Sequence, residues 1–207
     1  IGKKGFEMQL YTSGTTPFGR KVMVQILESG LEARVQVQGV AGSPLDPGTM
    51  PVDMNPLGKI PALIVGGQAI YDSRVICRYL DQVAGAGLYP TGDALWPVLT
   101  LEATADGILE AALLMVYEAR LRPEDKQFAP WVEGQWAKAA RALDAVEARW
   151  MALLNGPLTM AHIAVGVALG YLDFRHGARD WRAGRPQLAA WEKTFAARPS
   201  IAQTRPV

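Results

Sequence analysis

The segment from Thr12 to Lys21, Thr-Ser-Gly-Thr-Thr-Pro-Phe-Gly-Arg-Lys, gathers several hydroxyl groups at the expected start of a helix. Proline favours the first helical position, so Pro17 places Thr16 at the N-cap. A hydroxyl beside free backbone N–H groups at the positive end of a helix could bind an anion. On these grounds alone a plain helix cap is favoured. Ser13 or Thr15 could equally supply the hydroxyl of an anion site.

A second segment, from Asn55 to Leu63, places an Ile60–Pro61 bond immediately before an expected strand. Proline is tolerated where a strand begins at an edge or a bulge. In the cis form, this bond would turn the Ile60 backbone outward, where its N–H and C=O could hold a peptide-like ligand. Only about 5% of X-Pro bonds in folded proteins are cis, so the pattern by itself leaves the isomer open.

A third segment, Tyr71-Asp-Ser-Arg74, lies between an expected strand and an expected helix. Ser73 is a favourable N-cap, and Asp72 places a carboxylate beside the helix start. The alternative to two capping residues is a binding pair. Asp72 could accept a hydrogen bond from a ligand ammonium, while Ser73 and the exposed N–H groups hold a ligand carboxylate. Such a pair would recognise the α-amino-acid end of a ligand.

Other residues with distinctive chemistry are better explained by packing. Thr159 is suited to an N-cap, and His162 occupies the third helical position, where a capping box has an acidic residue. We expect His162 to be a packed core histidine rather than a catalyst. Cys77 lies in the middle of a helical pattern and is expected to be a small buried hydrophobe. One cysteine and two distant histidines give no pattern of a disulfide or a metal site.

The three segments join elements that alternate between strand and helix patterns in the first half of the chain. Alternation of polar and apolar residues predicts strands, and Gly66-Gly67 between two short strands predicts a hairpin. The order is strand, helix, strand, then hairpin and helix, which gives a small mixed sheet with helices on it. The expected strands are 8–12, 34–38, 60–65 and 68–71, and the expected helices are 17–29 and 73–84.

The second half of the chain has helical patterns only. Gly85 to Gly92 is a break in composition and the best candidate for a domain boundary. The helix expected at 158–174 is apolar nearly all round, so it should lie at the centre of a bundle. We therefore predict an α/β domain over residues 8–86 and an all-α domain over 93–207. The expected helices are 95–122, 124–154, 158–174 and 187–197, the last closed by Pro199.

Composition argues against several classes of function. The 207 residues include 21 basic and 20 acidic ones, and this net charge of +1 makes a general nucleic-acid binder improbable. The N-terminal residues 1–7 lack the apolar region of a secretion signal. The uncharged stretch 150–172 is broken by Asn155-Gly-Pro157, so it is too short for a membrane span and suits a buried helix. We expect a soluble, cytoplasmic protein without nucleic-acid or membrane partners.

In combination, these signals resemble the glutathione S-transferase family, and most of all a bacterial branch of short homologues. The resemblance rests first on Thr-Pro-Phe-Gly-Arg-Lys at 16–21, Asn-Pro-Leu-Gly-Lys-Ile-Pro at 55–61 and Asp-Ser at 72–73. In the second half it rests on Gly-Tyr-Leu-Asp-Phe-Arg at 170–175 and Arg-Pro-Ser at 198–200. It covers nearly the whole chain and implies a thioredoxin-like domain followed by an α-helical domain.

The resemblance also implies roles for the short segments toward glutathione. Pro61 matches the cis-proline of the family, and Ile60 would bond the cysteinyl unit through its backbone. Lys59 matches a position that can contact glutathione. Asp72 and Ser73 match the pair that binds the γ-glutamyl end.

The sulfur of glutathione would lie near Thr16, where related enzymes place the Ser or Cys that acts on it, and Ser13 is a second candidate. A hydroxyl donor at a helix N-terminus favours the thiolate, the nucleophilic form of a thiol whose pKa is otherwise about 8.5. The absence of a cysteine at position 16 argues against the thiol-exchange branch of the family. The leading hypothesis is a detoxifying transferase that conjugates glutathione, its co-substrate, to a small hydrophobic electrophile.

The alternative hypothesis is a module with the transferase fold that binds glutathione but has lost catalysis. For the electrophile, apolar side chains such as those of Leu113, Leu114 and Tyr117 are candidate pocket residues. The family resemblance further implies a homodimer, formed through the helix at 73–84 and the first helix of the bundle. An apolar surplus on residues 95–117, beyond what one buried stripe needs, agrees with this expectation.

Overall fold

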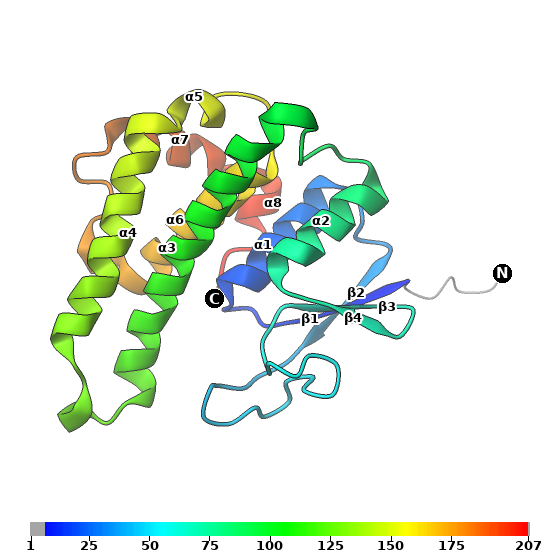
Figure 1. The fold of residues 1–207 in the computed structure, drawn as a ribbon, viewed down its shortest axis with the longest axis horizontal. Helices are drawn as coiled ribbons and strands as arrows, with labels where there is room; N and C mark the ends of the chain where they lie inside the picture. Colours follow the sequence, from blue (N-terminus) through cyan, green and yellow to red (C-terminus); the bar gives the residue numbers. More distant parts are fainter. Residues whose placement is uncertain (1–6, 207) are drawn as a thin grey trace. The chain divides into compact units, whose positions relative to one another are not determined.

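A computed structural model describes residues 7–206. The chain divides into two compact units, the first extending to Leu88 and the second formed by Tyr89–Arg205. The order of the elements, strands and two helices followed by helices only, confirms the fold class expected from the sequence. Figure 1 labels these elements. Residues 1–6, where the sequence predicts no secretion signal, lie outside the described range.

The first unit is built on a four-stranded mixed sheet with the strand order β2-β1-β3-β4. β1 pairs in parallel with β2, and β3 is antiparallel to both β1 and β4. Gly66 and Gly67 form the hairpin turn with φ of 54° and 81°, values that favour glycine. The strands are β1 (Met8–Thr12), β2 (Val35–Gly39), β3 (Ala62–Val65) and β4 (Gln68–Ile70).

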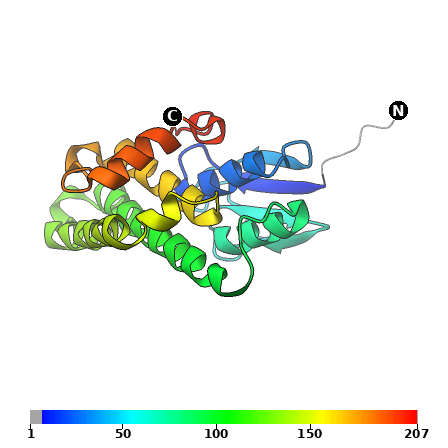
Figure 2. The ribbon, with the colours of Figure 1, turned by 90° about the horizontal axis from the view of Figure 1, so that it is seen from above.

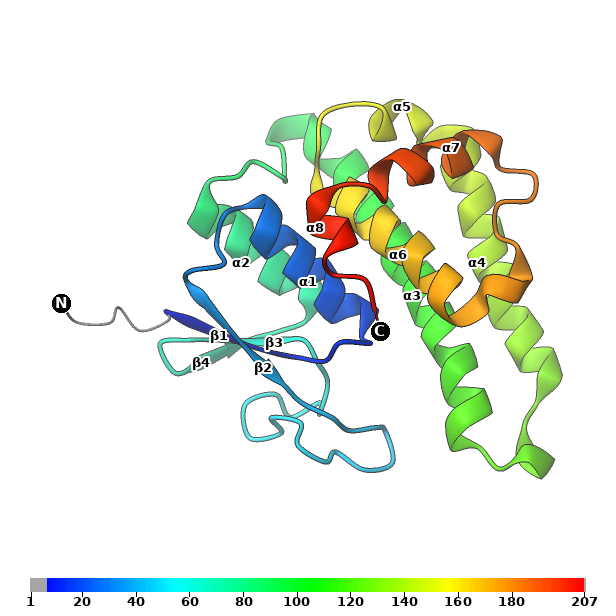
Figure 3. The ribbon, with the colours of Figure 1, turned by 180° about the vertical axis from the view of Figure 1, so that it is seen from behind.

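Two helices, α1 (Pro17–Glu28) and α2 (Ser73–Ala84), lie on one side of this sheet, while the connection 40–61 lies on the other (Figures 1 and 3). The helices pack against each other, and a buried hydrogen bond of 2.7 Å runs from Gln25 Nε2 on α1 to the Cys77 carbonyl on α2. Cys77 is fully buried, as expected for a small core residue. This bond ties the third turn of α1 to the second turn of α2.

In the second unit, α3 packs against both α4 and α6, and α7 contacts α4, α5 and α6 (Figure 2). Nearly every side chain of α6 is buried from Met160 to Leu172, which agrees with the central position that its apolar sequence predicts. The helices are α3 (Leu95–Leu121), α4 (Ala129–Arg149), α5 (Met151–Leu154), α6 (Met160–His176), α7 (Pro186–Phe195) and α8 (Pro199–Ala202). Short 3-10 turns are at Gly92–Ala94, Glu124–Lys126 and Gly177–Arg179.

The single helix expected at 124–154 was a wrong prediction, because this segment is a 3-10 turn followed by α4 and α5. Pro130 explains the late start of α4: in the first turn its missing N–H is harmless, whereas inside a longer helix it would remove a bond and clash. Glu118 stabilises the connection between α3 and α4, because its Oε1 accepts a hydrogen bond of 2.9 Å from the Phe128 N–H. Pro199 likewise opens α8 rather than only ending the preceding helix.

His162 closes the N-terminal turn of α6 with its ring. Its Nδ1 accepts a hydrogen bond of 3.1 Å from the backbone N–H of Thr159 and lies 2.9 Å from the Thr159 hydroxyl oxygen. The ring is buried and packs near Trp191 and Phe195, whose own rings stack at 4.6 Å. His162 therefore combines the two roles considered for it, a core residue and a member of the capping box.

We predict that the protein loses stability as the pH falls from 7.5 to 5.5. Burial lowers the pKa of both His162 and His176 below the usual value of about 6.5. The unfolded chain therefore binds protons in this range that the folded chain does not. Each histidine then lowers the free energy of unfolding by at most about 1.4 kcal/mol per pH unit. Urea unfolding at several pH values measures the slope.

The His162→Gln variant isolates the contribution of this ring, because glutamine keeps an acceptor for the Thr159 N–H but does not titrate. Its free energy of unfolding should depend less steeply on pH between 7.5 and 5.5 than that of the wild type. A slope equal to the wild-type slope would show that His162 takes no part in this pH dependence.

Candidate functional site

The three segments that the sequence marks for chemistry meet at one edge of the sheet. β1 and β4 end at this edge and β3 begins there, because β3 is antiparallel to both of its neighbours. The helices α1 and α2 follow β1 and β4 directly, so their N-terminal ends also open at this edge. This end of the sheet, where strands end and helices begin, is called the shared edge below. It is a candidate binding site of the first unit.

The strand register shows which residues are neighbours. Ala62, the first residue of β3, is paired with Tyr11 of β1. One step further along both strands, Pro61 lies beside Thr12 at the end of β1. The register between β3 and β4, continued in the same way, places Asp72 on the other side of Pro61. Pro61 is thus the middle residue at the shared edge, and it lies between the segments that lead into α1 and α2.

Thr16 is the N-cap residue of α1, and Pro17 is its first helical residue, both as the sequence predicts. The hydroxyl of Thr16 makes no cap hydrogen bond, so the plain cap favoured by the pattern is not formed. A Cβ on Gly19 would overlap the Thr16 methyl and the Thr12 hydroxyl, which shows how closely the methyl packs on this glycine. The methyl group of Thr16 packs against Gly19, and the hydroxyl group makes no hydrogen bond to the start of the helix.

Asp72, rather than Ser73, is the N-cap of α2, so the sequence interpretation of Ser73 as the cap was wrong. A carboxylate at this position reaches the second N–H of the helix: Asp72 Oδ1 accepts a hydrogen bond of 3.0 Å from the Arg74 N–H. Its Oδ2 accepts a second one, of 2.9 Å, from the Arg74 guanidinium. Ser73 becomes the first helical residue, and its side chain is buried beneath the helix start.

The Asp72 carboxyl is held in its charged form. Partial burial opposes ionisation, but the hydrogen bonds and charge of Arg74 and the charge of Lys21 outweigh it and lower the pKa of Asp72. Two of the four lone-pair directions of a carboxylate remain for a ligand after the bonds to Arg74. About half of the side chain is exposed, so a ligand ammonium can reach it.

Lys21 is a residue of the site region that sequence analysis missed. It is fully buried on α1, one turn before Gln25, and its positive charge acts on Asp72. Lysine is very seldom fully buried without a partner. The sequence feature that could have revealed Lys21 is its spacing of four residues from Gln25. This spacing places both residues on the same face of α1, the face that turns toward α2.

The loop before β3 is braced by Asn55, which is almost completely buried. Its Nδ2 donates a hydrogen bond of 2.8 Å to the Lys59 carbonyl, and its Oδ1 accepts one of 3.1 Å from the Leu57 N–H. Gly58 completes the turn with a φ of 58°, a value that favours glycine. The Asn-Pro-Leu-Gly-Lys pattern therefore encodes a rigid turn that presents Lys59 and the residue after it.

The remaining predicted residues are arranged around this turn. The Lys59 side chain is exposed, Ile60 is half-buried, and Pro61 is buried. The Ile60–Pro61 peptide bond is cis, and so is the Tyr71–Asp72 bond. Ser13, half-buried, lies between the end of β1 and the start of α1.

The chemistry of the edge suits a short zwitterionic ligand. Two helix N-termini supply backbone N–H groups and positive dipole ends, which favour anionic groups such as a carboxylate or a thiolate. The Asp72 carboxylate supplies the opposite charge for an ammonium. The Ile60 backbone, which precedes the paired residues of β3, can bond a ligand backbone. Among residues 7–206 no group of three or more His, Cys, Asp or Glu side chains could hold a metal ion.

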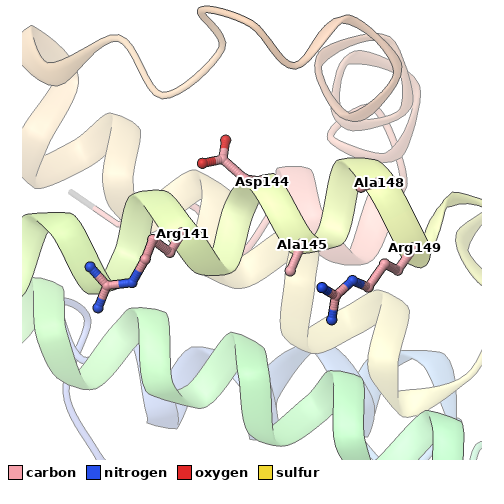
Figure 4. A pocket seen from close by; sticks show the side chains of 5 residues that line it. All are labelled: Arg141, Asp144, Ala145, Ala148 and Arg149. Carbon is pink, nitrogen blue, oxygen red and sulfur yellow. The ribbon is translucent and has the colours of Figure 1, made fainter.

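The candidate pocket residues of the second unit lie on α3. Leu113 and Tyr117 are half-buried, and Leu114 is 39% exposed. A separate open hollow, shown in Figure 4, is lined by α4 alone, through Arg141, Asp144, Ala145, Ala148 and Arg149. It contains none of the residues that the sequence singles out. No helix within residues 7–206 has both the length and the apolarity of a membrane span.

Comparison with known protein families gives two matches. Residues 15–83 match the model of the "Glutathione S-transferase, N-terminal domain", and residues 129–193 match that of the "Glutathione S-transferase, C-terminal domain". The chain is 33% identical over 204 residues to the uncharacterized GST-like protein YibF of Escherichia coli, covering 96% of this chain and 98% of that protein. It is 28% identical over 207 residues to glutathione S-transferase 3 of Zea mays, covering 95% and 92%.

Solved structures of bacterial proteins are similar over nearly their whole length. A glutathione transferase family member from Pseudomonas fluorescens Pf-5 with bound glutathione is 46% identical, with a TM-score of 0.94 over 97% of this chain and 99% of that one. The structure with bound S-(propanoic acid)-glutathione is also 46% identical, with a TM-score of 0.90 over 97% of this chain and 100% of that one. A glutathione S-transferase from Methylobacillus flagellatus KT with glutathione bound is 38% identical, with a TM-score of 0.85 over 97% of this chain and 100% of that one.

Proposed function

The chain belongs to the glutathione S-transferase family, and we propose that it binds glutathione as a co-substrate and transfers its sulfur to a small hydrophobic electrophile. The observation that carries this proposal is the meeting of Thr16, Pro61 and Asp72 at one sheet edge, between two helix N-termini. We assign glutathione binding to the thioredoxin-like domain of residues 8–86, followed by the α-helical domain of residues 93–207.

The proposed binding mode uses the charges at the edge. The α-ammonium of the γ-glutamyl end is held by the Asp72 carboxylate, which the structure keeps ionised. Its carboxylate is held by Ser73 and the N–H groups at the start of α2. The cysteinyl unit pairs with the Ile60 backbone beside Pro61, and Lys59 contacts the ligand from the braced turn.

The proposed chemistry begins with the thiol. Its sulfur lies near the start of α1, where the Thr16 hydroxyl, with Ser13 as the alternative, donates a hydrogen bond to the thiolate. A donor and a helix N-terminus lower the thiol pKa, and each unit corresponds to about 1.4 kcal/mol of preference for the thiolate. The thiolate then attacks the electrophile, which proximity to the bound sulfur favours.

A related structure supports the conjugation. The Pseudomonas fluorescens protein, 46% identical, was solved with a thioether of glutathione, S-(propanoic acid)-glutathione. A thioether is what remains when a glutathione thiolate has joined the carbon of an electrophile. We place this chain's reaction in the cytoplasm, as a detoxification step, because the thiol pool of that compartment is kept reduced by glutathione.

The experiment that tests the function has two readouts. Isothermal titration with glutathione measures binding, and a panel of alkyl and aryl halides with glutathione measures turnover above the uncatalysed rate. Binding with turnover is the expected result. Binding without turnover with any member of the panel would favour the non-catalytic module, and no binding would refute both.

We further propose that the protein is a homodimer, formed through α2 and α3. The support is a set of large apolar side chains exposed on these helices: Val75 is 51% exposed, Trp96 64% and Leu114 39%. Large apolar side chains that are exposed to solvent favour association. Sedimentation equilibrium should give about twice the chain mass of 22.4 kDa at micromolar concentration. A mass of one chain would refute the dimer.

A further inference from the structure

We propose that Thr12 is a positioning residue for the reaction, because its buried hydroxyl competes with the glutathione sulfur for the hydroxyl of Thr16. Thr12 is the last residue of β1, and Thr16 is the N-cap of α1. The inference rests on the proposed function in one respect: it takes the Thr16 hydroxyl as the hydrogen-bond donor to the sulfur. Thr12 itself does not touch the ligand and acts only through Thr16.

The hydroxyl of Thr12 is buried without a hydrogen-bond partner. Thr12 is only 5% exposed, and among residues 7–206 no donor or acceptor bonds its Oγ1. Its place in the strand suits an apolar side chain, since Met8 and Leu10 are the other buried residues of β1. An unpaired buried hydroxyl is costly, whereas valine would have nearly the same shape without that cost. The Thr12 hydroxyl therefore lacks a partner that another arrangement of its neighbours could supply.

Thr16 lies beside this hydroxyl, but it presents its methyl group there. A Cβ on Gly19 would overlap both the Thr12 Oγ1 and the Thr16 Cγ2, so these two atoms lie against the same point of α1. Gly19 has no side chain to fill that point, which lets both threonines pack on it. The Thr16 hydroxyl makes no cap hydrogen bond, so the helix start does not fix its direction.

Rotation of Thr16 about its Cα–Cβ bond exchanges the two branches of the side chain. The staggered positions are about 120° apart, so one step places the hydroxyl where the methyl now lies. The Thr16 backbone is extended, with φ of −78° and ψ of 123°, so a preceding helical turn does not exclude this rotamer. In that position the Thr16 hydroxyl meets the Thr12 hydroxyl, and each of them can donate or accept a hydrogen bond.

Thr16 therefore has two arrangements. In the inward arrangement its hydroxyl bonds Thr12 and is withdrawn from the ligand. In the outward arrangement, which the structure shows, the methyl packs on Gly19 and the hydroxyl is left for the sulfur. A thiolate is charged and accepts a stronger hydrogen bond than a hydroxyl does, so bound glutathione draws the Thr16 hydroxyl outward. The inward bond opposes this step and weakens the stabilisation of the thiolate.

The first test is the pH titration of bound glutathione in Thr12→Val, followed by thiolate absorbance. Valine keeps the branched shape of threonine and removes the inward partner of Thr16. One neutral hydrogen bond changes an equilibrium by about twofold to tenfold, so the pKa of the bound thiol should fall by about 0.3 to 1. The rate at pH 6.5 should rise by about twofold to tenfold, a gain that damage to the fold would not produce. An unchanged or higher thiol pKa would overturn the inference.

Three further variants locate the effect. Thr12→Ser keeps the hydroxyl and should titrate like the wild type. Thr12→Val combined with Thr16→Ala should titrate like Thr16→Ala alone, because no hydroxyl remains for Thr12 to hold. A fall in the thiol pKa that persists without the Thr16 hydroxyl would overturn the inference.

Ser29→Ala is the matched control among these variants. Ser29 caps the C-terminal end of α1, and its Oγ is likewise buried without a hydrogen-bond partner among residues 7–206. Its loss removes the same kind of group at the end of the helix away from Thr16, so the titration should stay that of the wild type. An equal fall in the thiol pKa in Ser29→Ala and Thr12→Val would refute a specific role of Thr12.

Unfolding of the protein without glutathione separates failure of this inference from failure of the proposed function. Thr12→Val, Thr16→Val and the double variant form a cycle whose coupling reports the bond between the two hydroxyls. The equilibrium constant of unfolding should show a coupling of about twofold to tenfold. Additive effects would refute the inward bond. Coupling in a protein that does not bind glutathione would support the inward bond and refute only the proposed function.

Thr12→Val is expected to fold, because the position lies on the buried face of β1 and valine is common in strands. Thermal unfolding checks each variant. If Thr12→Val does not fold, Thr12→Ala removes the same hydroxyl, and the same fall in the thiol pKa is expected. A thiol pKa that Thr12→Ala leaves unchanged would then overturn the inference.

Discussion

The Asp72→Ala variant is expected to bind glutathione about tenfold to a hundredfold more weakly than the wild type. The lost interaction is a hydrogen bond between two charged groups, typically about 1.5–3 kcal/mol. Arg74 and Lys21 keep the Asp72 carboxylate ionised, so it can act on the α-ammonium of glutathione throughout the neutral range. Isothermal titration at pH 7 measures the change in the dissociation constant.

The Asp72→Asn variant separates the charge from the helix cap. Alanine also removes the acceptor for the Arg74 N–H, which should cost about 1 kcal/mol of stability. Asparagine keeps that acceptor, so the free energy of unfolding should stay near the wild-type value while glutathione binding remains weak. Wild-type affinity in Asp72→Ala would contradict the assigned role, since it would show that Asp72 serves only as the helix cap.

The elements that position the site could be predicted because their sequence patterns are local. The alternating burial of β1, the Gly66-Gly67 turn and the Pro17 start of α1 each depend on a few adjacent residues. The shared edge also followed from the order of the elements, since a strand before each helix start fixes where that start lies. Family resemblance then assigned the residues.

The parts that the sequence did not predict depend on contacts between distant residues. The break before α4 needs Glu118 to reach the Phe128 N–H, ten residues away. The burial of Lys21 depends on how α1 packs against α2. No local pattern records these contacts, which is why they emerged only from the structure.

The Thr16→Ala variant is expected to bind glutathione nearly as well as the wild type but to react about tenfold more slowly below pH 7. Loss of the hydroxyl donor should raise the pKa of the bound thiol by about one unit, because one unit corresponds to about 1.4 kcal/mol of thiolate stabilisation. The structure supports this role, since the Thr16 hydroxyl makes no cap bond to α1. Steady-state rates at pH 6.5 and isothermal titration measure the two effects.

Two further variants separate the hydroxyl from the methyl of Thr16. Thr16→Val keeps a methyl for the close contact with Gly19 and lacks the hydroxyl, so it should behave like Thr16→Ala. Thr16→Ser keeps the hydroxyl and should stay near the wild-type rate. A slow Thr16→Ser with a normal Thr16→Val would show that packing on Gly19, rather than the hydroxyl, supports the reaction.

The pH titration of bound glutathione, followed by the ultraviolet absorbance of its thiolate, tests whether the Thr16 hydroxyl stabilises the thiolate. At saturating protein, we expect a thiol pKa below the usual value of about 8.5 in the wild type, and a higher value in Thr16→Ala and Thr16→Val. Ser13→Ala, titrated in parallel, covers the second candidate. Identical titration curves for the wild type and both Thr16 variants would contradict the assignment of Thr16 as the partner of the sulfur.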